Sequence, residues 1–229
     1  MTSIILNNIT YQPDPAAMLE SLRIRPGSSR EQEFQEFLEH ALEIARPKVI
    51  YKVAFIEEKG TSHVVVDGTR LESRVLRVNL DAVHRVFPYV VTCGQELETW
   101  QEGIDDFLHR FWVDAIKESA LEAAFKTFDQ HLNETFEPGP VSTMNPGSLE
   151  DWPLPQQRPL FGLLGDVEAA VGVRLTESFL MLPNKTVSGL VFPTTTSFAS
   201  CQLCPRAVCP NRRAPYDAEL FEQKYAKTE

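Results

Sequence analysis

The feature of this sequence that most constrains its fold is a long helical pattern in the middle of the chain. Between Ile104 and Asn133, apolar residues recur at intervals of three and four, close to the 3.6-residue period of an α-helix. The pattern predicts a central helix that packs against a sheet. The predicted apolar face consists of Phe107, Leu108, Phe111, Ala115, Ala120, Leu121, Ala124, Phe125, Phe128 and Leu132.

Strand-like segments lie on both sides of this helix in the sequence. They are rich in β-branched and aromatic residues, or they alternate between apolar and polar residues. The predicted strands are 49–56, 63–66, 74–80, 87–91, 179–182 and 186–192. Two helical pieces, split at Arg25-Pro26-Gly27, precede them within 14–45. Because strands and helices do not alternate regularly, we expect a single α+β domain with a twisted, largely antiparallel sheet packed against long helices.

The C-terminal third contains more irregular segments. Six prolines within 138–159 predict an extended loop, because proline fixes φ and removes a backbone donor. A short helix is expected over 160–172, and a charged terminal helix over 217–224. We therefore divide the chain into an α+β domain, 1–198, and a Cys-, Pro- and Arg-rich tail with the terminal helix, 199–229.

Composition and charge exclude several functional classes. The chain has 229 residues, 22 Lys+Arg and 32 Asp+Glu, and a net charge of −10. This acidic balance argues against nucleic acid as the main partner, since phosphate binding needs a basic face. No apolar run approaches the ~18 residues of a membrane span, and no secretory signal is visible at the N-terminus. We expect a cytoplasmic protein that makes no membrane contact and whose thiols are reduced.

The most specific local motif is Cys201-x2-Cys204-x4-Cys209. Three thiolates within nine residues can converge on one zinc ion or one iron–sulfur cluster. The nearby Arg206, Arg212 and Arg213 would offset the negative charge of the thiolates. Cys93 is the only other cysteine and is the candidate fourth ligand. The choice between iron–sulfur and zinc stays open, and so does a zinc knot that only pins the tail.

A second signal extends from residue 172 to residue 192. It consists of Leu-Thr-Glu-Ser-Phe at 175–179, then Met181 and Pro183, Val-Ser-Gly at 187–189, and Phe192. Taken alone, it predicts a hairpin with a buried apolar face. A Pro146-Gly147 loop followed by Leu163-Leu164 precedes it, and Leu-Glu-Ala-Ala-Phe at 121–125 precedes that loop.

In this order, the motifs resemble the reactivation domain of cobalamin-dependent methionine synthase, most clearly over 105–192. The resemblance implies a mixed α+β domain that clamps onto a cobalamin-carrying partner. In that family, S-adenosylmethionine remethylates the cobalt after an electron donor has reduced it. The ligand-contacting positions that the resemblance implies are Glu122, Pro146, Gly147, Thr176, Glu177, Ser188 and Gly189.

Three departures from the family pattern shape the functional hypothesis. The family's Arg-x-x-x-Gly-Tyr loop, whose arginine grips the ligand carboxylate, has Thr143 and Ser148 at its two ends here. A threonine hydroxyl cannot replace a bidentate guanidinium, so we expect weak or absent S-adenosylmethionine binding unless Arg158 reaches in. The sequence shows no cobalamin-binding domain, so the corrinoid is expected on a separate protein. The cysteine tail is similar to an extension of stand-alone relatives from anaerobic bacteria.

These observations lead to one main hypothesis and two alternatives. The main one is a stand-alone, reactivation-domain-like protein that acts on a corrinoid protein or a methionine synthase subunit, with an electron donor as further partner. Its chemistry would be cobalt reduction or methyl transfer, and whether the protein is itself a methyltransferase stays open. The first alternative is a non-catalytic docking module with a structural zinc site. The second, an ordinary S-adenosylmethionine-dependent methyltransferase, is weakened by the missing arginine and the lack of a Gly-rich nucleotide loop.

Overall fold

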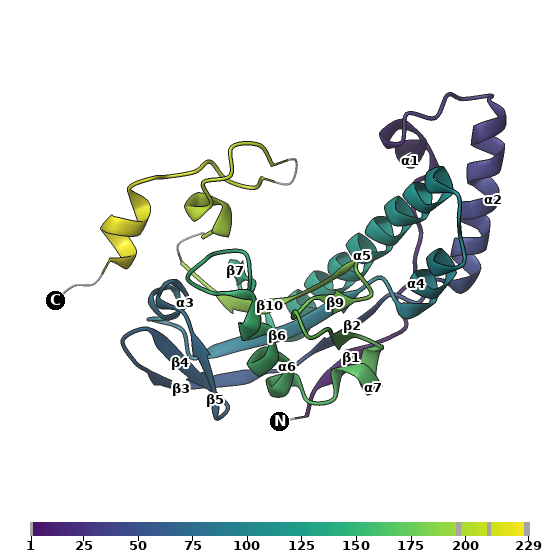
Figure 1. Ribbon diagram of the computed structural model, residues 1–229. Helices are drawn as coiled ribbons and strands as arrows, with labels where there is room; N and C mark the ends of the chain where they lie inside the picture. Colours follow the sequence, from purple (N-terminus) through teal and green to yellow (C-terminus); the bar gives the residue numbers. More distant parts are fainter. Residues whose placement is uncertain (1, 196–197, 210–211, 227–229) are drawn as a thin grey trace.

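The computed structural model describes residues 2–195, 198–209 and 212–226, and its centre is an eight-stranded sheet (Figure 1). β6 is the middle strand: β2 and β3 pair along one edge of it, and β10 pairs along the other. β1 and the β4–β5 hairpin extend the first side, and β7 pairs with the outer edge of β10. The strands are β1 (Ile4–Leu6), β2 (Lys48–Tyr51), β3 (Ala54–Lys59), β4 (His63–Val66), β5 (Thr69–Glu72), β6 (Arg85–Thr92), β7 (Val141–Met144) and β10 (Thr186–Pro193).

All pairs between these strands are antiparallel, and a small antiparallel pair, β8 (Arg174–Leu175) and β9 (Met181–Leu182), lies apart from the main sheet. The expected α+β fold with a largely antiparallel sheet is therefore confirmed. The helices are α1 (Pro15–Ser21), α2 (Ser29–Ile44), α3 (Arg74–Asn79), α4 (Gln95–Glu102), α5 (Phe107–Phe136), α6 (Gln157–Leu164) and α7 (Val167–Val171). Short turns η1 (Leu154–Gln156) and η2 (Ser200–Leu203) and a π-helix η3 (Phe221–Tyr225) complete the chain.

The predicted central helix is α5, which begins where the Asp106 side chain accepts a hydrogen bond from the backbone N–H of His109 at 2.9 Å. Its C-terminal half packs on the sheet, where Phe128 contacts Tyr51 and Tyr89. Its N-terminal half extends beyond the sheet to α1, α2 and α4, as Figure 1 shows. One helix thus joins the sheet to a separate group of helices.

The predicted apolar face of α5 is wrong over its first turns. Phe107 and Phe111 are 85% and 53% exposed, whereas Trp112 and Ile116 are buried. The buried row recurs every four residues, and at 3.6 residues per turn such a row drifts around the helix by ~40° per step. The drift lets one helix face α2 and α4 at its start and the sheet at its end. The row consists of Trp112, Ile116, Ala120, Ala124, Phe128 and Leu132.

The strand predicted over 74–80 is also wrong, because this segment forms α3. Ser73 caps the helix, with its hydroxyl accepting from the Leu76 N–H at 2.9 Å. Asp151 adds a second cap from a distant loop: its carboxylate accepts the N–H groups of Arg74 at 3.0 Å and Val75 at 2.8 Å. The nearest strand is β5, which ends just before Ser73.

Later segments differ from expectation in detail. The proline-rich loop contains β7 and η1, and the helix predicted over 160–172 is divided at Gly165 into α6 and α7. The predicted hairpin over 179–192 does not form, because β9 pairs with β8 and β10 pairs with β6 and β7. The terminal helix is reduced to η3. No described helix is long and apolar enough to cross a membrane.

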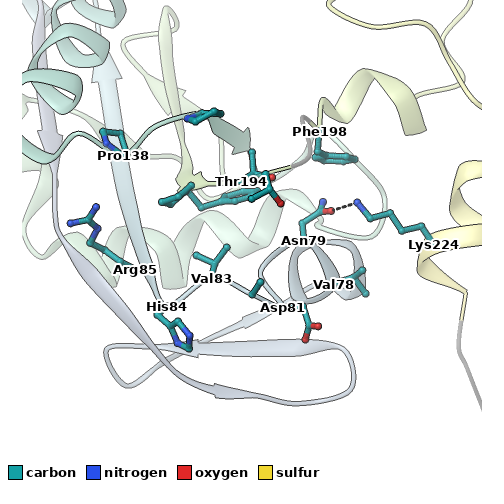
Figure 2. Close-up of a pocket in the computed structure, with 15 residues that line it drawn as sticks. Val78, Asn79, Asp81, Val83, His84, Arg85, Pro138, Thr194, Phe198 and Lys224 are labelled. Carbon is teal, nitrogen blue, oxygen red and sulfur yellow. Dashed lines mark hydrogen bonds between the residues drawn. The ribbon is translucent and has the colours of Figure 1, made fainter.

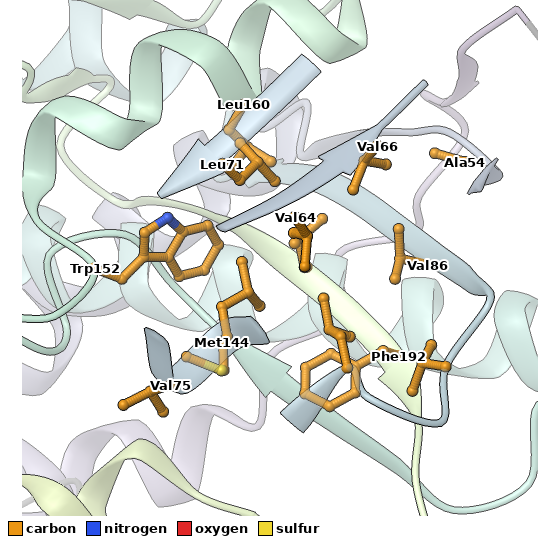
Figure 3. Close-up of a cluster of buried hydrophobic side chains, with 14 of the residues drawn as sticks. Ala54, Val64, Val66, Leu71, Val75, Val86, Met144, Trp152, Leu160 and Phe192 are labelled. Carbon is orange, nitrogen blue, oxygen red and sulfur yellow. The ribbon is translucent and has the colours of Figure 1, made fainter. Parts of the chain in front are cut away.

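The tail packs on the main apolar core of the sheet. Tyr225 of the tail and Phe198, which directly precedes the tail, belong to the same buried cluster as Met144 and Trp152, part of which is shown in Figure 3. The Tyr225 hydroxyl donates to Asn79 Oδ1 at 2.8 Å, so η3 is held against α3. The tail therefore lies at the end of the sheet opposite α1 and α2.

Lys117 is an unexpected feature of this fold, because its side chain is completely buried on α5. Its ammonium donates to Glu98 at 2.7 Å and to Gln101 at 2.8 Å, both on α4. Glu98 also accepts the backbone N–H of Asn184, which lies just before β10. This ion pair connects two helices with the sheet.

We predict that Glu98→Ala lowers the free energy of unfolding by about 3 kcal/mol, because it leaves a buried ammonium without its carboxylate. Glu102→Ala, which removes an exposed acid from the same helix, should change it by less than about 0.5 kcal/mol. Urea unfolding followed by circular dichroism measures both. Equal effects of the two variants would contradict the prediction.

Candidate functional site

The resemblance placed candidate ligand contacts on β10 and on the loop after β7, and the structure joins these two segments through Asn145. The Asn145 amide donates to the Tyr89 hydroxyl and to the Ser188 carbonyl, each at 2.8 Å. Both hydrogen bonds pass directly over the Cα of Gly189. A Cβ added there would lie 2.5 Å from the Met144 carbonyl oxygen. Gly189 is therefore required by the close approach of β7 and β10. Ser188 is 2% exposed, and its hydroxyl finds no hydrogen-bond partner within the described residues.

Charged groups surround the Tyr89 hydroxyl at this edge. Burial is the main cause of its raised pKa, with Asp129 of α5 raising it further and Arg213 of the tail lowering it. The pKa of the Asp129 carboxyl is itself raised by desolvation. Residues of α5 and the tail thus act electrostatically on one buried phenol of β6.

Glu122 belongs to an acidic stripe on α5 beside β10. Asp114, Glu118, Glu122 and Asp129 lie within one face of the helix, since their spacings are close to whole turns. At one end of the stripe, Lys185 pairs with Asp114 at 3.0 Å and with Glu118 at 2.9 Å. Glu122 is exposed midway along the stripe and is available to a ligand or a partner.

The loop that contains Pro146 and Gly147 is tightly folded. Pro146 is buried, and Gly147 has φ +85°, a conformation that favours glycine. The Gly147 N–H donates to the Trp152 carbonyl at 2.7 Å, which closes the loop. The loop then leads to Asp151, the distant cap of α3.

A cleft of about 500 Å³ lies between this loop and the cysteine tail. It brings together two sequence-predicted residues, Gly147 and Cys204. Glu150 and Asp151 supply carboxylates, and Tyr216 and Phe221 supply aromatic walls. The tail is thus part of the candidate site and does not form a separate appendage.

Arg212 organises the backbone of the cysteine loop. Its guanidinium donates to the carbonyl oxygens of Cys201 at 3.1 Å and Cys204 at 3.4 Å, and also to that of Arg206. Its predicted role as a counter-charge for thiolates is thus accompanied by a role on the backbone. The Cys201 sulfur accepts the Arg213 N–H at 3.4 Å, and this bond is the main cause of a lowered pKa for its thiol.

The structure does not gather the four cysteines into one cluster. Across its described parts, no three His, Cys, Asp or Glu side chains lie close enough to hold a metal ion. Cys93 is fully buried beside Leu97 and Trp112, and burial raises the pKa of its thiol to about 12. Cys93 directly follows β6, beside Thr186 at the start of β10. The tail instead pairs with β7 at Thr143, which lies opposite Val191 of β10, so the two places are ~16 Å apart along β10.

Thr176 and Glu177 lie away from this edge, in the turn between β8 and β9. The Thr176 hydroxyl accepts the Leu180 N–H at 3.0 Å, which stabilises the turn, and Glu177 is exposed. The Arg158 guanidinium lies 5.1 Å from the centre of the Phe179 ring. Arg158 therefore contacts this turn, and the described residues show no contact between Arg158 and Thr143.

Thr143 itself is covered by the tail. It pairs with Val191 of β10 on one side and forms a parallel bridge to Ala199 on the other. Both backbone edges of Thr143 are therefore paired within the chain, and the position that the resemblance aligns with the family's arginine carries a half-buried threonine. Asn145 and Tyr89 were not predicted as site residues, and Arg213 was predicted only as a counter-charge for the thiolates. Only the position of Asn145 within the family loop could have indicated that residue.

Comparison with known proteins agrees with this geometry. Residues 153–201, about a fifth of the chain, match the family described as vitamin B12 dependent methionine synthase, activation domain. Over these residues the chain is similar to that activation domain. Its fold is that of the MetH reactivation domain in a crystal structure with bound AdoHcy, at a TM-score of 0.61 and 16% identity, over 87% of this chain and 81% of that one. No curated protein matches the sequence.

We predict that Gly189→Ala destabilises the protein by about 1–3 kcal/mol, because its Cβ would overlap the Met144 carbonyl oxygen and Asn145. Gly162→Ala is the matched control. Gly162 lies in α6 with open space around it, so alanine should stabilise that helix by up to about 1 kcal/mol. Thermal unfolding followed by circular dichroism separates the two. A shift in the same direction for both variants would refute the assignment of Gly189 to a close backbone contact.

Proposed function

We propose that this protein works as a stand-alone reactivation-domain-like protein on a separate corrinoid protein, in methionine synthesis or a related methyl transfer. Its chemistry is support of cobalt reduction or of methyl transfer. The observation that carries the proposal is that the family match over 153–201 reaches the first cysteine of the motif, while the fold agrees over most of the chain. The domain part, 1–198, supplies the docking face, and the tail, 199–229, supplies the redox or metal function.

The candidate ligand contacts in this proposal are the positions along β10, α5 and the 146–147 loop. Glu122 is exposed on the acidic stripe, and Gly189 permits the Asn145–Tyr89 contact. Pro146 and Gly147 shape the loop beside the tail. Ser188 offers a buried hydroxyl without a partner, whereas Thr176 and Glu177 act through the β8–β9 turn.

We also propose that Cys201, Cys204 and Cys209 bind one metal centre. Cys201 and Cys204 lie at the start and just past the end of η2, and side chains three residues apart on a 3₁₀ turn share one side. The Cys204 N–H donates to the Cys201 carbonyl at 3.3 Å, which keeps this turn closed. Cys209 has to close onto this pair when metal binds, and Arg212 already restrains the intervening backbone.

The experiment for the main proposal uses the full chain and a purified cobalamin-loaded corrinoid protein. We expect the two to co-elute in size-exclusion chromatography, and we expect the cobalamin spectrum or the rate of cobalt reduction by a chemical reductant to change. Glu122→Lys should weaken the complex, and Glu36→Lys, an exposed acid on α2, should not. Absence of both co-elution and spectral change would end the proposal.

The alternative is a non-catalytic docking module whose tail holds a structural zinc ion. The backbone role of Arg212 favours it, since a loop already fixed by four carbonyl contacts can serve structure alone. Colour distinguishes the two proposals. An iron–sulfur protein is brown and bleaches on reduction, whereas a zinc protein is colourless.

We predict that the anaerobically purified protein contains iron or zinc, and that Cys204→Ala loses it. Ligation removes thiol protons, so metal affinity should fall as the pH falls. Metal analysis and absorption spectra provide the measurement.

Cys93→Ala is the matched variant for this experiment and tests the predicted fourth ligand. Full retention of metal by Cys93→Ala would exclude Cys93. Wild type without either metal, or a Cys204→Ala variant with its full complement, would refute the centre.

We predict that neither S-adenosylmethionine nor S-adenosylhomocysteine binds with low-micromolar affinity. Loss of a charge-assisted hydrogen bond costs about 1.5–3 kcal/mol, or roughly one to two decades in affinity. Titration calorimetry on the purified protein measures this, with the Thr143→Arg/Ser148→Tyr double variant as the comparison. Low-micromolar binding by wild type would show that another cation holds the carboxylate.

A further inference from the structure

A second cavity, of about 490 Å³, lies at the edge of the sheet where β6 begins and β10 ends, away from the cleft beside Gly147 (Figure 2). Its walls come from the segment after α3, the start of β6, the α5–β7 connection, the end of β10 and the tail. Its size falls within the range of small-molecule sites. Much of its lining is apolar and aromatic, including Phe192, Phe198, Pro138, Pro140, Pro193 and Val83.

The charges in this cavity are unbalanced. Arg85 is half-buried at one side, and within the described residues its guanidinium forms no hydrogen bond or ion pair. It lies over the rings of Phe87 at 5.3 Å and Phe136 at 5.8 Å, which leaves the edge of the guanidinium to donate. An arginine fixed on aromatic rings without an acceptor is suited to a carboxylate, sulfonate or phosphate group.

The other cation is Lys224, on the far side of the cavity from Arg85. Its ammonium donates to Asn79 Oδ1 at 3.1 Å and lies 5.9 Å from the centre of the Phe198 ring. Desolvation lowers its pKa, and no described carboxylate pairs with it.

Among the described residues that line the cavity, Asp81 is the one acid, and it is already paired with Arg77 at 2.7 Å. In a chain with a net charge of −10, a cavity with two cations and no free acid is an exception. The field inside it favours an anion.

We infer that this cavity binds a small organic anion, whose apolar body lies against Phe192 and Phe198 and whose acidic group is held by Arg85. Lys224 contributes positive charge on the opposite side. The aromatic walls supply the hydrophobic part of the affinity, and Arg85 supplies the selectivity for an acid. This site is separate from the corrinoid-related proposal and does not depend on it.

The test uses two fluorescent probes on the full chain. 8-Anilinonaphthalene-1-sulfonate carries an aromatic body and an acidic group, and N-phenyl-1-naphthylamine carries the same body without the charge. We expect the sulfonate to bind with a 1:1 stoichiometry, and Arg85→Met to raise its Kd about tenfold or more. Arg85→Met should change the Kd of the neutral probe less than about twofold, which also shows that the cavity is intact.

Matched variants make this test specific. Lys224→Met should weaken the sulfonate to a smaller degree, and Lys126→Met, an exposed cation on α5, should leave it unchanged. Arg85→Lys should recover part of the affinity. Competition by benzoate and by inorganic phosphate, one of which should displace the sulfonate, then distinguishes a carboxylate from a phosphate ligand. The inference is overturned if Arg85→Met leaves sulfonate binding unchanged or if neither competitor acts. It is also overturned if Phe111→Ser abolishes the binding, because Phe111 is an exposed residue of α5 that does not line the cavity.

Discussion

The structure depends on one buried charge, the Lys117 ammonium at the junction of three elements. Removing such an ion from water costs several kcal/mol, so Glu98 and Gln101 have to remain beside it. Glu98 also accepts the Asn184 N–H, and this places the start of β10 relative to α4 and α5. Ser188 and Gly189 follow Asn184 by four and five residues on β10, so this ion pair lies near the candidate site along the strand. This ion pair is more specific than apolar packing, because its three hydrogen bonds form together only when Lys117, Glu98, Gln101 and Asn184 keep this arrangement.

Local patterns predicted the elements that local physics decides. β4 (His63–Val66) agrees with the sequence analysis, because a run of β-branched residues favours a strand through interactions over a few residues. Segment 74–80 failed because its decisive interaction comes from Asp151, more than 70 residues away. The first turns of α5 failed for a related reason: a period shows that one face is apolar, but the neighbours decide which face is buried. No local signal could show that those neighbours would be α2 and α4.

The candidate site divides in the same way. The resemblance implied ligand contacts at Gly189 and in the 146–147 loop, and the structure brings both to one sheet edge through the contacts of Asn145. It could not foresee Arg213 near Tyr89 or the bridge between Thr143 and Ala199, because both involve the tail, which the clearest part of the resemblance does not include. The cysteine spacing predicted a shared ligand set, yet the spacing alone cannot show whether the loop is closed without metal. Arg212 answers the backbone part of that question by holding three carbonyl oxygens of the loop.

The bridge between Thr143 and Ala199 makes the proposed roles of the loop and the tail interdependent. The tail pairs with the backbone edge of Thr143, so a ligand bound beside this residue would lie next to the tail. Moving the tail would also expose Phe198, which is 6% exposed and packs with Tyr225 on the core. Burial of a phenylalanine contributes about 1.5–3 kcal/mol, so displacement carries a cost of that order before any ligand binds. The docked tail and the threonine at position 143 therefore act in the same direction: the tail occupies the edge of β7, and position 143 offers no cation for a carboxylate.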